Sequence, residues 1–149
     1  MIRKVRPIDS VLDRLVQLES LNFGQEAWNK QMLLDMFSNK WCMPYAYYIE
    51  QTIVGYCVLV NCGEFCDIAN IVVDKQYTNR GIGSEMMQYM IDKSIKLKVD
   101  HILLEVNTLN ERAIRLYEKH GFKIIALRKN FYAHTLFQSN DAYSMLKKL

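Results

Sequence analysis

The stretch from residue 67 to residue 97 changes its hydrophobic period part-way along, and this change constrains the fold more than any other feature of the chain. Residues 67–73 alternate on a period of two, with Ala69, Ile71 and Val73 on one side of a predicted strand. From residue 82 onward apolar side chains recur on a helical period, at Ile82, Met86, Met87, Met90, Ile91 and Leu97. The chain is therefore expected to pass from a strand through a short polar turn into a helix.

That turn contains two glycines and a fixed positive charge, in the order Arg80, Gly81, Ile82, Gly83 and Ser84. The first amides of a helix have no intrahelical acceptor, and a residue without a Cβ lets an anion approach the backbone closely. The turn is thus a candidate phosphate site. It lacks the third glycine of a dinucleotide fingerprint and the lysine of a P-loop, which argues against nicotinamide binding and nucleotide hydrolysis. A glycine-containing helix start without a ligand is the alternative.

The remaining periodic segments predict an α+β fold, with one mixed sheet of about seven strands and about four flanking helices. Short turns make the strands before residue 73 antiparallel neighbours, whereas the helix after residue 82 makes the next strand parallel to its predecessor with a right-handed crossover. Strands are expected at 2–6, 45–50, 53–61, 67–73, 101–106, 122–128 and 142–146, helices at 9–21, 28–37, 82–97 and 110–120, and loops at 38–44 and 129–140. Asp9 or Ser10 is expected to cap the first helix.

Length and composition limit the classes of function. The 149 residues suffice for one well-buried domain, expected to span residues 1–149. The net charge of +3 is spread along the chain, whereas nucleic-acid binding would call for a basic stripe. No apolar run reaches membrane-spanning length and no signal peptide is seen at the start, so a cytoplasmic protein without a membrane partner is expected. The four cysteines and three histidines fit no zinc spacing, so reduced thiols and no metal site are predicted.

Glu105 is a carboxylate within the otherwise apolar strand 101–106. Leu104 and Val106 are expected on the opposite face of the sheet, and Leu103 on the same face as Glu105. An amine arrives as an ammonium ion and must lose a proton before it attacks, and a partly buried carboxylate can accept that proton, directly or through water. The alternative is a strand-end carboxylate that reaches solvent or an arginine.

A second constellation lies one strand beyond the glycine turn. It reads N-x-x-A-x-x-x-Y-x-x-x-G-F, with Asn110, Ala113, Tyr117, Gly121 and Phe122. In order and mutual spacing, the two motifs together resemble the GNAT superfamily of acyl-CoA-dependent N-acetyltransferases, and the resemblance covers nearly the whole chain. One departure is Thr78, which stands where the family usually has glutamine or arginine in its Q/R-x-x-G-x-G/A turn.

The resemblance implies that acetyl-CoA is the cosubstrate and that the two central parallel strands splay apart. It places the pantetheine arm against Ile71, Val72 and Val73 and against Asn110, and the pyrophosphate on the turn from Arg80 to Ser84. Glu105 would be the general base and Tyr117 would protonate the departing thiolate. From the residues alone, Tyr117 could equally be an aromatic core residue and Asn110 only a helix cap.

Within the superfamily the chain is most similar to the RimI-like ribosomal-protein alanine N-acetyltransferases. The shared features are Trp28 in the second helix, the strand segment 104–106, the late pair 141–142, and the loop segment Arg128, Lys129, Asn130, Phe131 and Tyr132. This resemblance implies substrate contacts from Trp28, Asn130, Phe131 and Tyr132. Phe131 replaces a tyrosine of the family loop and so lacks a hydroxyl.

The expected reaction is direct transfer of acetyl from acetyl-CoA to a primary amine, with a protein N-terminal α-amine as acceptor. A ping-pong route through Cys57, Cys62 or Cys66 is the mechanistic alternative, although the sequence shows no activating base for them. The alternative acceptors are small amines such as a polyamine, an amino acid or an aminoglycoside. A non-catalytic acyl-CoA-binding module is the alternative function, and either a monomer or a homodimer is expected.

Overall fold

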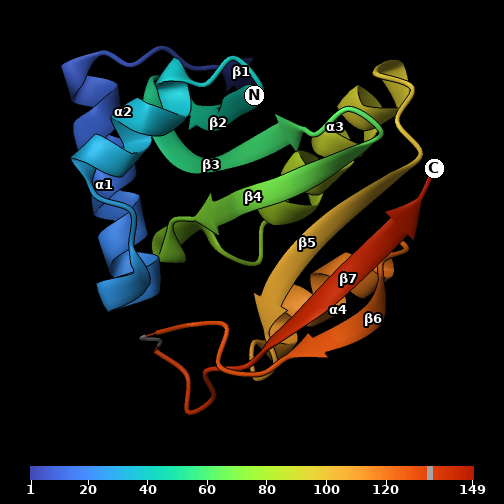
Figure 1. Ribbon diagram of the computed structural model, residues 1–149. Helices are drawn as coiled ribbons and strands as arrows, with labels where there is room; N and C mark the ends of the chain where they lie inside the picture. Colours follow the sequence, from blue (N-terminus) through green and yellow to red (C-terminus); the bar gives the residue numbers. More distant parts are fainter. Residues whose placement is uncertain (134–135) are drawn as a thin grey trace.

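The computed structural model describes residues 1–133 and 136–149 and has a seven-stranded sheet with helices on both faces (Figure 1). The strand order is β1-β2-β3-β4-β5-β7-β6. The strands are β1 (Ile2–Lys4), β2 (Cys42–Ile49), β3 (Thr52–Asn61), β4 (Phe65–Val73), β5 (His101–Asn107), β6 (Lys123–Arg128) and β7 (Ala142–Lys148). The helices of the described residues are α1 (Asp9–Phe23), α2 (Lys30–Ser38), α3 (Ile82–Lys96), α4 (Glu111–Lys119) and the 3-10 turns η1 (Gly24–Glu26) and η2 (Lys75–Tyr77).

The sheet confirms the predicted fold class. Strands β1 to β4 form an antiparallel meander, β4 and β5 are parallel, and β7 lies between β5 and β6 and is antiparallel to both. One hydrophobic cluster packs α1 and α2 against one face of the sheet, and a second packs α3 and α4 against the other. In the part of the chain that the structure covers, no helix has the length and apolar character required to cross a membrane.

The start of α2, the cap of α1 and the start of β2 are among the features that differ from the sequence prediction. Helix α2 begins at Lys30 because the Asn29 side chain caps it by accepting from the Met32 amide at 2.9 Å, and this leaves Trp28 in the preceding loop. Helix α1 has Ile8 at its N-cap position with no side-chain cap, so neither Asp9 nor Ser10 has the expected role.

Strand β2 begins at Cys42, within the segment expected to be a loop. Pro44 has no amide hydrogen, but its carbonyl accepts a hydrogen bond from the Val5 amide at 3.4 Å and its register partner on β3 is Val58. The strand therefore continues on both sides of the proline.

A β-bulge interrupts β4 and changes which side chains face which core. Val58 of β3 is opposite Asn70 and Leu59 is opposite Ile68, so Ala69 is an extra residue without a partner on β3. Before the bulge Ile68 faces the α3 side, and after it Ile71 and Val73 face that side while Val72 faces α1 and α2. The regular alternation predicted for residues 67–73 is therefore wrong at one point, because a single extra residue reverses every later side chain.

The two parallel strands separate beyond the bulge. Residues Phe65–Ile68 of β4 pair with His101–Leu104 of β5, and the register pairs end there. From this point β4 continues alongside β3, and β5 continues alongside β7 as far as Asn107. The predicted splay is thus present, and it leaves a gap in the middle of the sheet that Figure 1 shows between β4 and β5.

Candidate active site

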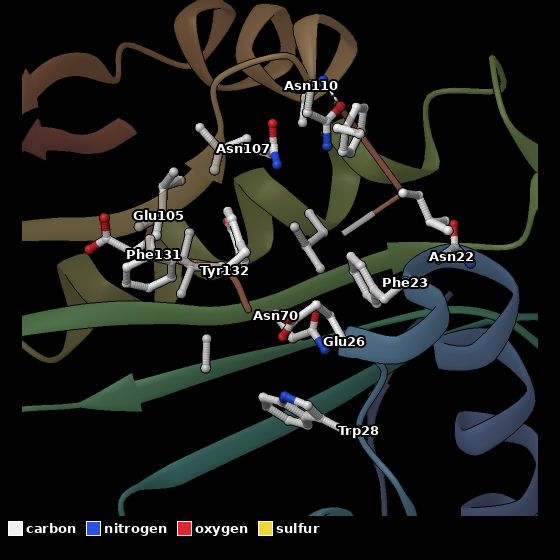
Figure 2. A pocket seen from close by; sticks show the side chains of 18 of the residues that line it. Asn22, Phe23, Glu26, Trp28, Asn70, Glu105, Asn107, Asn110, Phe131 and Tyr132 are labelled. Atoms are coloured by element: carbon white, nitrogen blue, oxygen red, sulfur yellow. Dashed lines mark hydrogen bonds between the residues drawn. The ribbon is translucent and has the colours of Figure 1, made fainter. Parts of the chain in front are cut away.

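A cavity of about 430 Å³ lies where β4 and β5 separate, and residues from both faces of the sheet line it. Its walls come from four parts of the chain: the splayed strands, helix α4, the end of α1 with the following loop, and the loop between β6 and β7 (Figure 2). Seven of the residues predicted for the site line it together, namely Trp28, Ile71, Glu105, Asn110, Tyr117, Phe131 and Tyr132. The cavity therefore brings Glu105, the Asn110 and Tyr117 motif and three of the predicted substrate residues into one site, whereas no residue of the glycine turn lines it.

Glu105 lies on β5 directly after the last residue that pairs with β4. Its neighbours Leu104 and Val106 are buried in the α3-side core, as the alternation predicted, so its own side chain faces the other way. The Ser144 hydroxyl of β7 donates a hydrogen bond to the Glu105 carboxylate, and the Arg128 Nε lies 3.9 Å from the same oxygen. The carboxylate is thus held in place while 23% of its side chain stays exposed.

Asp67 is a second carboxylate in the cavity that the sequence analysis missed. Burial raises its pKa to about 6, the charge of Glu105 adds to this, and Arg128 partly opposes it. Asp67 is a polar residue in an apolar strand, just as Glu105 is, and that resemblance is the signal that was available. The register of β4 against β5 decides that the two carboxylates are neighbours, and the local pattern does not contain that information.

Tyr117 projects from α4 into the cavity and is buried. Its ring packs edge-on against Phe122 with a centroid distance of 6.2 Å, so it also serves the core. Burial raises the pKa of its phenol, and the nearby Tyr132 hydroxyl adds to the shift. A phenol with a raised pKa stays protonated and is able to donate a hydrogen bond into the cavity.

Asn110 caps α4 and also lines the cavity. Its side-chain oxygen accepts from the Ala113 amide at 3.3 Å. Figure 2 places the rest of its amide group at the upper wall of the cavity, near Asn107. The cap and the ligand-binding role are therefore compatible, because the cap uses only the oxygen.

One side of the cavity is made of two parts of the chain that approach each other. Phe23 at the end of α1 and Glu26 and Trp28 of the α1–α2 connection form one part, and Phe131, Tyr132, Leu136 and Phe137 of the β6–β7 connection form the other. A Cβ added at Gly24 would lie 2.9 Å from the Leu136 side chain, so the two connections meet there. Asn130, which was predicted to contact the substrate, does not line the cavity. Its backbone is left-handed with φ 54° and its amide donates to the Asp141 carboxylate, so it is a turn residue. The loop residues 134 and 135 lie outside the described residues.

The glycine turn forms the first turn of α3 beside this cavity. Gly81 is the N-cap with φ 81°, a left-handed conformation that favours glycine, and it has open space on its side-chain side. Glycine is favoured at position 83 for a different reason, because a Cβ there would lie 3.3 Å from the Leu116 side chain of α4. The Ile82 side chain is buried, so only its amide is available to a ligand. Ser84 pairs its hydroxyl with His120 Nε2 at 2.8 Å.

Of the predicted cofactor contacts only Ile71 and Asn110 line the cavity, and the others lie outside its lining. The Arg80 guanidinium lies 4.9 Å from the Tyr77 ring centroid, at the edge of the turn. Val72 is buried against α1 and α2, so only its backbone is able to meet a ligand in the gap. Ile71 and Val73 face the α3 side, and Ile71 alone of the three lines the cavity.

A model of the acetyltransferase (GNAT) family matches residues 12–122, a segment that contains the glycine turn, Glu105 and Tyr117. The chain belongs to this family. Membership confirms the resemblance inferred from the two motifs. The match begins within α1 and ends at Phe122, so it leaves the β6–β7 connection outside.

Curated relatives carry RimI-type names, which agrees with the predicted resemblance within the GNAT superfamily. An Escherichia coli [ribosomal protein bS18]-alanine N-acetyltransferase is 39% identical over 66 residues, which is 44% of this chain and 45% of the relative. A Mycobacterium tuberculosis N-alpha-acetyltransferase RimI is 28% identical over 141 residues, covering 89% of this chain and 83% of the relative. The chain spans 40 to 45% of the length of the first curated relatives that it matches.

The GNAT fold is also seen in the solved structures that resemble this one. The ribosomal-protein-S18-alanine N-acetyltransferase of Escherichia coli superposes with a TM-score of 0.87 at 22% identity, covering 99% of this chain and 92% of that one. At this level of identity the likeness concerns the fold. It agrees with the mixed sheet, the splayed parallel pair and the four helices described above.

Proposed function

We propose that this domain transfers acetyl from acetyl-CoA directly to a primary amine, and that the acceptor is a protein N-terminal α-amine of the ribosomal-protein alanine type. The observation that carries the proposal is the single cavity at the splayed strands, which Glu105 and Tyr117 line together. Family membership supports the acetyl transfer, and the names of the RimI-type relatives support the acceptor. Because a ribosomal protein is the substrate in those names, we propose action in the cytoplasm.

The proposed contacts with CoA are made mainly by backbone groups. Beyond Ile68, β4 has no partner on its β5 side among the described residues, so its free backbone groups are available to pantetheine as an added strand would use them. The pyrophosphate is then placed on the first amides of α3, with Arg80 nearby, since these amides lack intrahelical acceptors. A backbone amide near Ile71 would face the thioester oxygen, and one such donor is worth about 3 kcal/mol in a dry site.

The chemical step uses two side chains that line the cavity, Glu105 of β5 and Tyr117 of α4. Glu105 accepts a proton from the acceptor ammonium, directly or through water, and the free amine attacks the thioester carbon. The carbon–sulfur bond breaks as the amide bond forms, and Tyr117 donates its proton to the departing thiolate. Burial keeps the Tyr117 phenol protonated, which suits a proton donor. Much of the rate gain is expected from holding the two reactants together.

The ping-pong alternative requires a reactive cysteine thiolate. Cys57 is fully buried, and burial raises its pKa to about 12, so the thiolate is scarce at neutral pH. Cys66 is also buried, and burial raises its pKa as well. Cys62 is exposed at the β3–β4 turn, and neither it nor the other two lines the cavity. These positions support direct transfer.

The proposed acceptor is tested by a turnover screen. Short peptides beginning with Ala, Ser, Gly or Met are assayed with acetyl-CoA beside polyamines, free amino acids and an aminoglycoside, and thiol release is measured. The expected result is turnover of peptides and a preference for Ala at the first position. Turnover of small amines alone would contradict the peptide acceptor but not acetyl transfer. Acetyl-CoA binding without turnover of any amine would favour a non-catalytic acyl-CoA-binding module.

A further inference from the structure

Glu19 is a carboxylate in the interior that the proposed reaction does not use. It lies on α1, its residue is 0% exposed, and it forms part of the cavity wall. The inward face of α1 is otherwise apolar, with Leu12, Leu15 and Leu18 almost fully buried. A buried carboxylate is costly unless it is well hydrogen-bonded, so its place in this face calls for a specific role.

Three donors from different parts of the chain meet at this carboxylate. The Tyr56 hydroxyl of β3 and the Asn70 side-chain amide of β4 both donate to Glu19 Oε1. The Trp28 backbone amide donates to Glu19 Oε2 at 3.3 Å. Asn70 Nδ2 also lies 3.1 Å from the Tyr56 hydroxyl, which closes the network. Burial raises the pKa of Glu19, whereas the bonds from Tyr56, Trp28 and Asn70 act in the opposite direction.

Two of the three donors, Asn70 and Trp28, belong to the cavity wall, and the third does not. Asn70 follows the bulge, where β4 leaves β5, and Trp28 lies in the connection that forms the acceptor wall. Figure 2 shows Asn70 and Trp28 on the same side of the cavity, beside Glu26. Tyr56 is fully buried behind them and is not part of the lining. One carboxylate thus ties the acceptor loop to the edge of the splayed strand.

We propose that Glu19 is a positioning residue for the amine acceptor: its Oε2 holds the Trp28 amide and so sets the α1–α2 connection against the mouth of the cavity. This inference rests on the proposed function, because it assigns the connection to acceptor binding. The loss of this bond should therefore weaken acceptor binding and leave acetyl-CoA binding nearly unchanged, since the CoA half lies at β4, α3 and α4.

Glu19→Gln separates the loop contact from the rest of the network. If the new amide oxygen takes the place of Oε1, it still accepts from Tyr56 and Asn70, and the new NH2 group faces the Trp28 amide, donor against donor. In the opposite orientation the NH2 group would take the place of Oε1, where it would face two donors, the Asn70 amide and the Tyr56 hydroxyl. The first orientation is favoured, so the substitution removes chiefly the bond to the loop.

The test measures the KM of the acceptor peptide and the KM of acetyl-CoA separately in the full chain. For Glu19→Gln we expect about a tenfold rise in acceptor KM, as befits a lost bond to a charged group, with acetyl-CoA KM within about twofold. The matched control is Tyr56→Phe, which removes a donor to the same carboxylate but not the loop bond. It is expected to lower the melting temperature and to leave acceptor KM within about twofold.

Two results would overturn the inference. One is an equal change in both KM values for Glu19→Gln, and the other is an equal rise in acceptor KM for Tyr56→Phe, because either would mean a general structural role. If Glu19→Gln does not fold, amide exchange in the wild type decides: the Trp28 amide should exchange slowly although it lies in a loop, and fast exchange would contradict the bond. A wild type that acetylates no amine would instead overturn the proposed function itself.

Discussion

At the scale of single residues, Asp67 and Glu105 are two of the carboxylates that line the cavity. Glu105 has a hydroxyl donor from Ser144 and an arginine nearby, whereas the pKa of Asp67 is raised to about 6. Their closeness is part of the reason, since the charge of Glu105 disfavours a charge on Asp67.

Glu105→Gln is predicted to lower kcat by about 10²- to 10⁴-fold, because it removes the proton acceptor but keeps the size of the side chain. The loss should be greatest at low pH, where the acceptor amine is hardest to deprotonate. Steady-state rates from pH 6 to pH 9.5 provide the check. The acetyl-CoA dissociation constant serves as the control and is expected to stay the same. An unchanged rate profile would remove Glu105 as the base.

Asp67→Asn is predicted to stabilise the fold at neutral pH. The folded pKa of about 6 exceeds the ordinary value of 3.8, so the folded state binds the proton more tightly than the unfolded state. Asp67 therefore costs stability increasingly as the pH rises from about 4 to about 6, and the cost persists above that range. With allowance for partial solvent exposure, the gain at pH 7.5 should be about 1 to 2 kcal/mol.

Denaturant unfolding of the wild type and of Asp67→Asn at pH 7.5 and near pH 4 measures this gain. It should shrink markedly at the lower pH, where the native Asp67 is already protonated. A gain of the same size at both pH values would indicate that packing, not ionisation, is responsible.

At the scale of elements, the bulge in β4 and the first turn of α3 are the two features that we propose to hold CoA. The bulge directs Ile71 and Val73 toward α3, and the pairing of β4 with β5 ends just before it. The turn adds helix amides behind a left-handed Gly81. A strand edge and a helix start thus lie next to each other within one continuous segment, which is why this segment dominates the sequence pattern.

Gly81→Ala is predicted to cost about 1 kcal/mol of stability and also to weaken acetyl-CoA binding, since a left-handed non-glycine residue is strained and the strain falls on the phosphate turn. Gly63→Ala is the matched control. Gly63 has φ 93° in the β3–β4 turn, with the same open space around its side-chain position as Gly81. Both variants should lose similar stability, but only Gly81→Ala should lose ligand-induced stabilisation in a thermal-shift titration with acetyl-CoA. Equal stabilisation of the two by acetyl-CoA would speak against a phosphate role for the turn.

At the scale of the whole molecule, one cavity extends from the connections proposed to bind the acceptor to the splayed strands proposed to bind CoA. Both substrates are therefore expected to be bound at the same time, and acetyl transfer needs no relay on the enzyme. The two connections that meet at Gly24 and Leu136 close the acceptor side of this passage.

Initial rates with both substrates varied are predicted to give intersecting lines, because direct transfer requires a ternary complex. Parallel lines would indicate an acetylated enzyme and would contradict direct transfer. Cys62→Ala, at the exposed thiol of the β3–β4 turn, is expected to retain full activity and tests the one accessible cysteine of the three. Acetyl-CoA at 100 times its dissociation constant should add about 2.7 kcal/mol of stability.

Much of the fold and part of the site could be predicted because they depend on local patterns. The strand and helix periods, the glycine turn and the position of Glu105 in an apolar strand are all readable from neighbouring residues. The predicted boundaries were wrong where a single side chain set the end of an element, as with the Asn29 cap that leaves Trp28 in a loop. The identity of the ligand came from the family resemblance, because hydrophobic periodicity carries no information about ligands.

By itself, the sequence determined the order of strands and helices and the glycine turn at the start of a helix, and it singled out Glu105 and Tyr117, which line one cavity. Only the tertiary structure decided that Asp67 lies near Glu105, that Ala69 is the bulged residue, and that Glu19 meets Tyr56, Asn70 and Trp28. The physical reason is range. Periodicity and capping act over a few residues, whereas strand register and the environment of a buried charge depend on distant segments, as with Glu19 and Asn70, which are 51 positions apart.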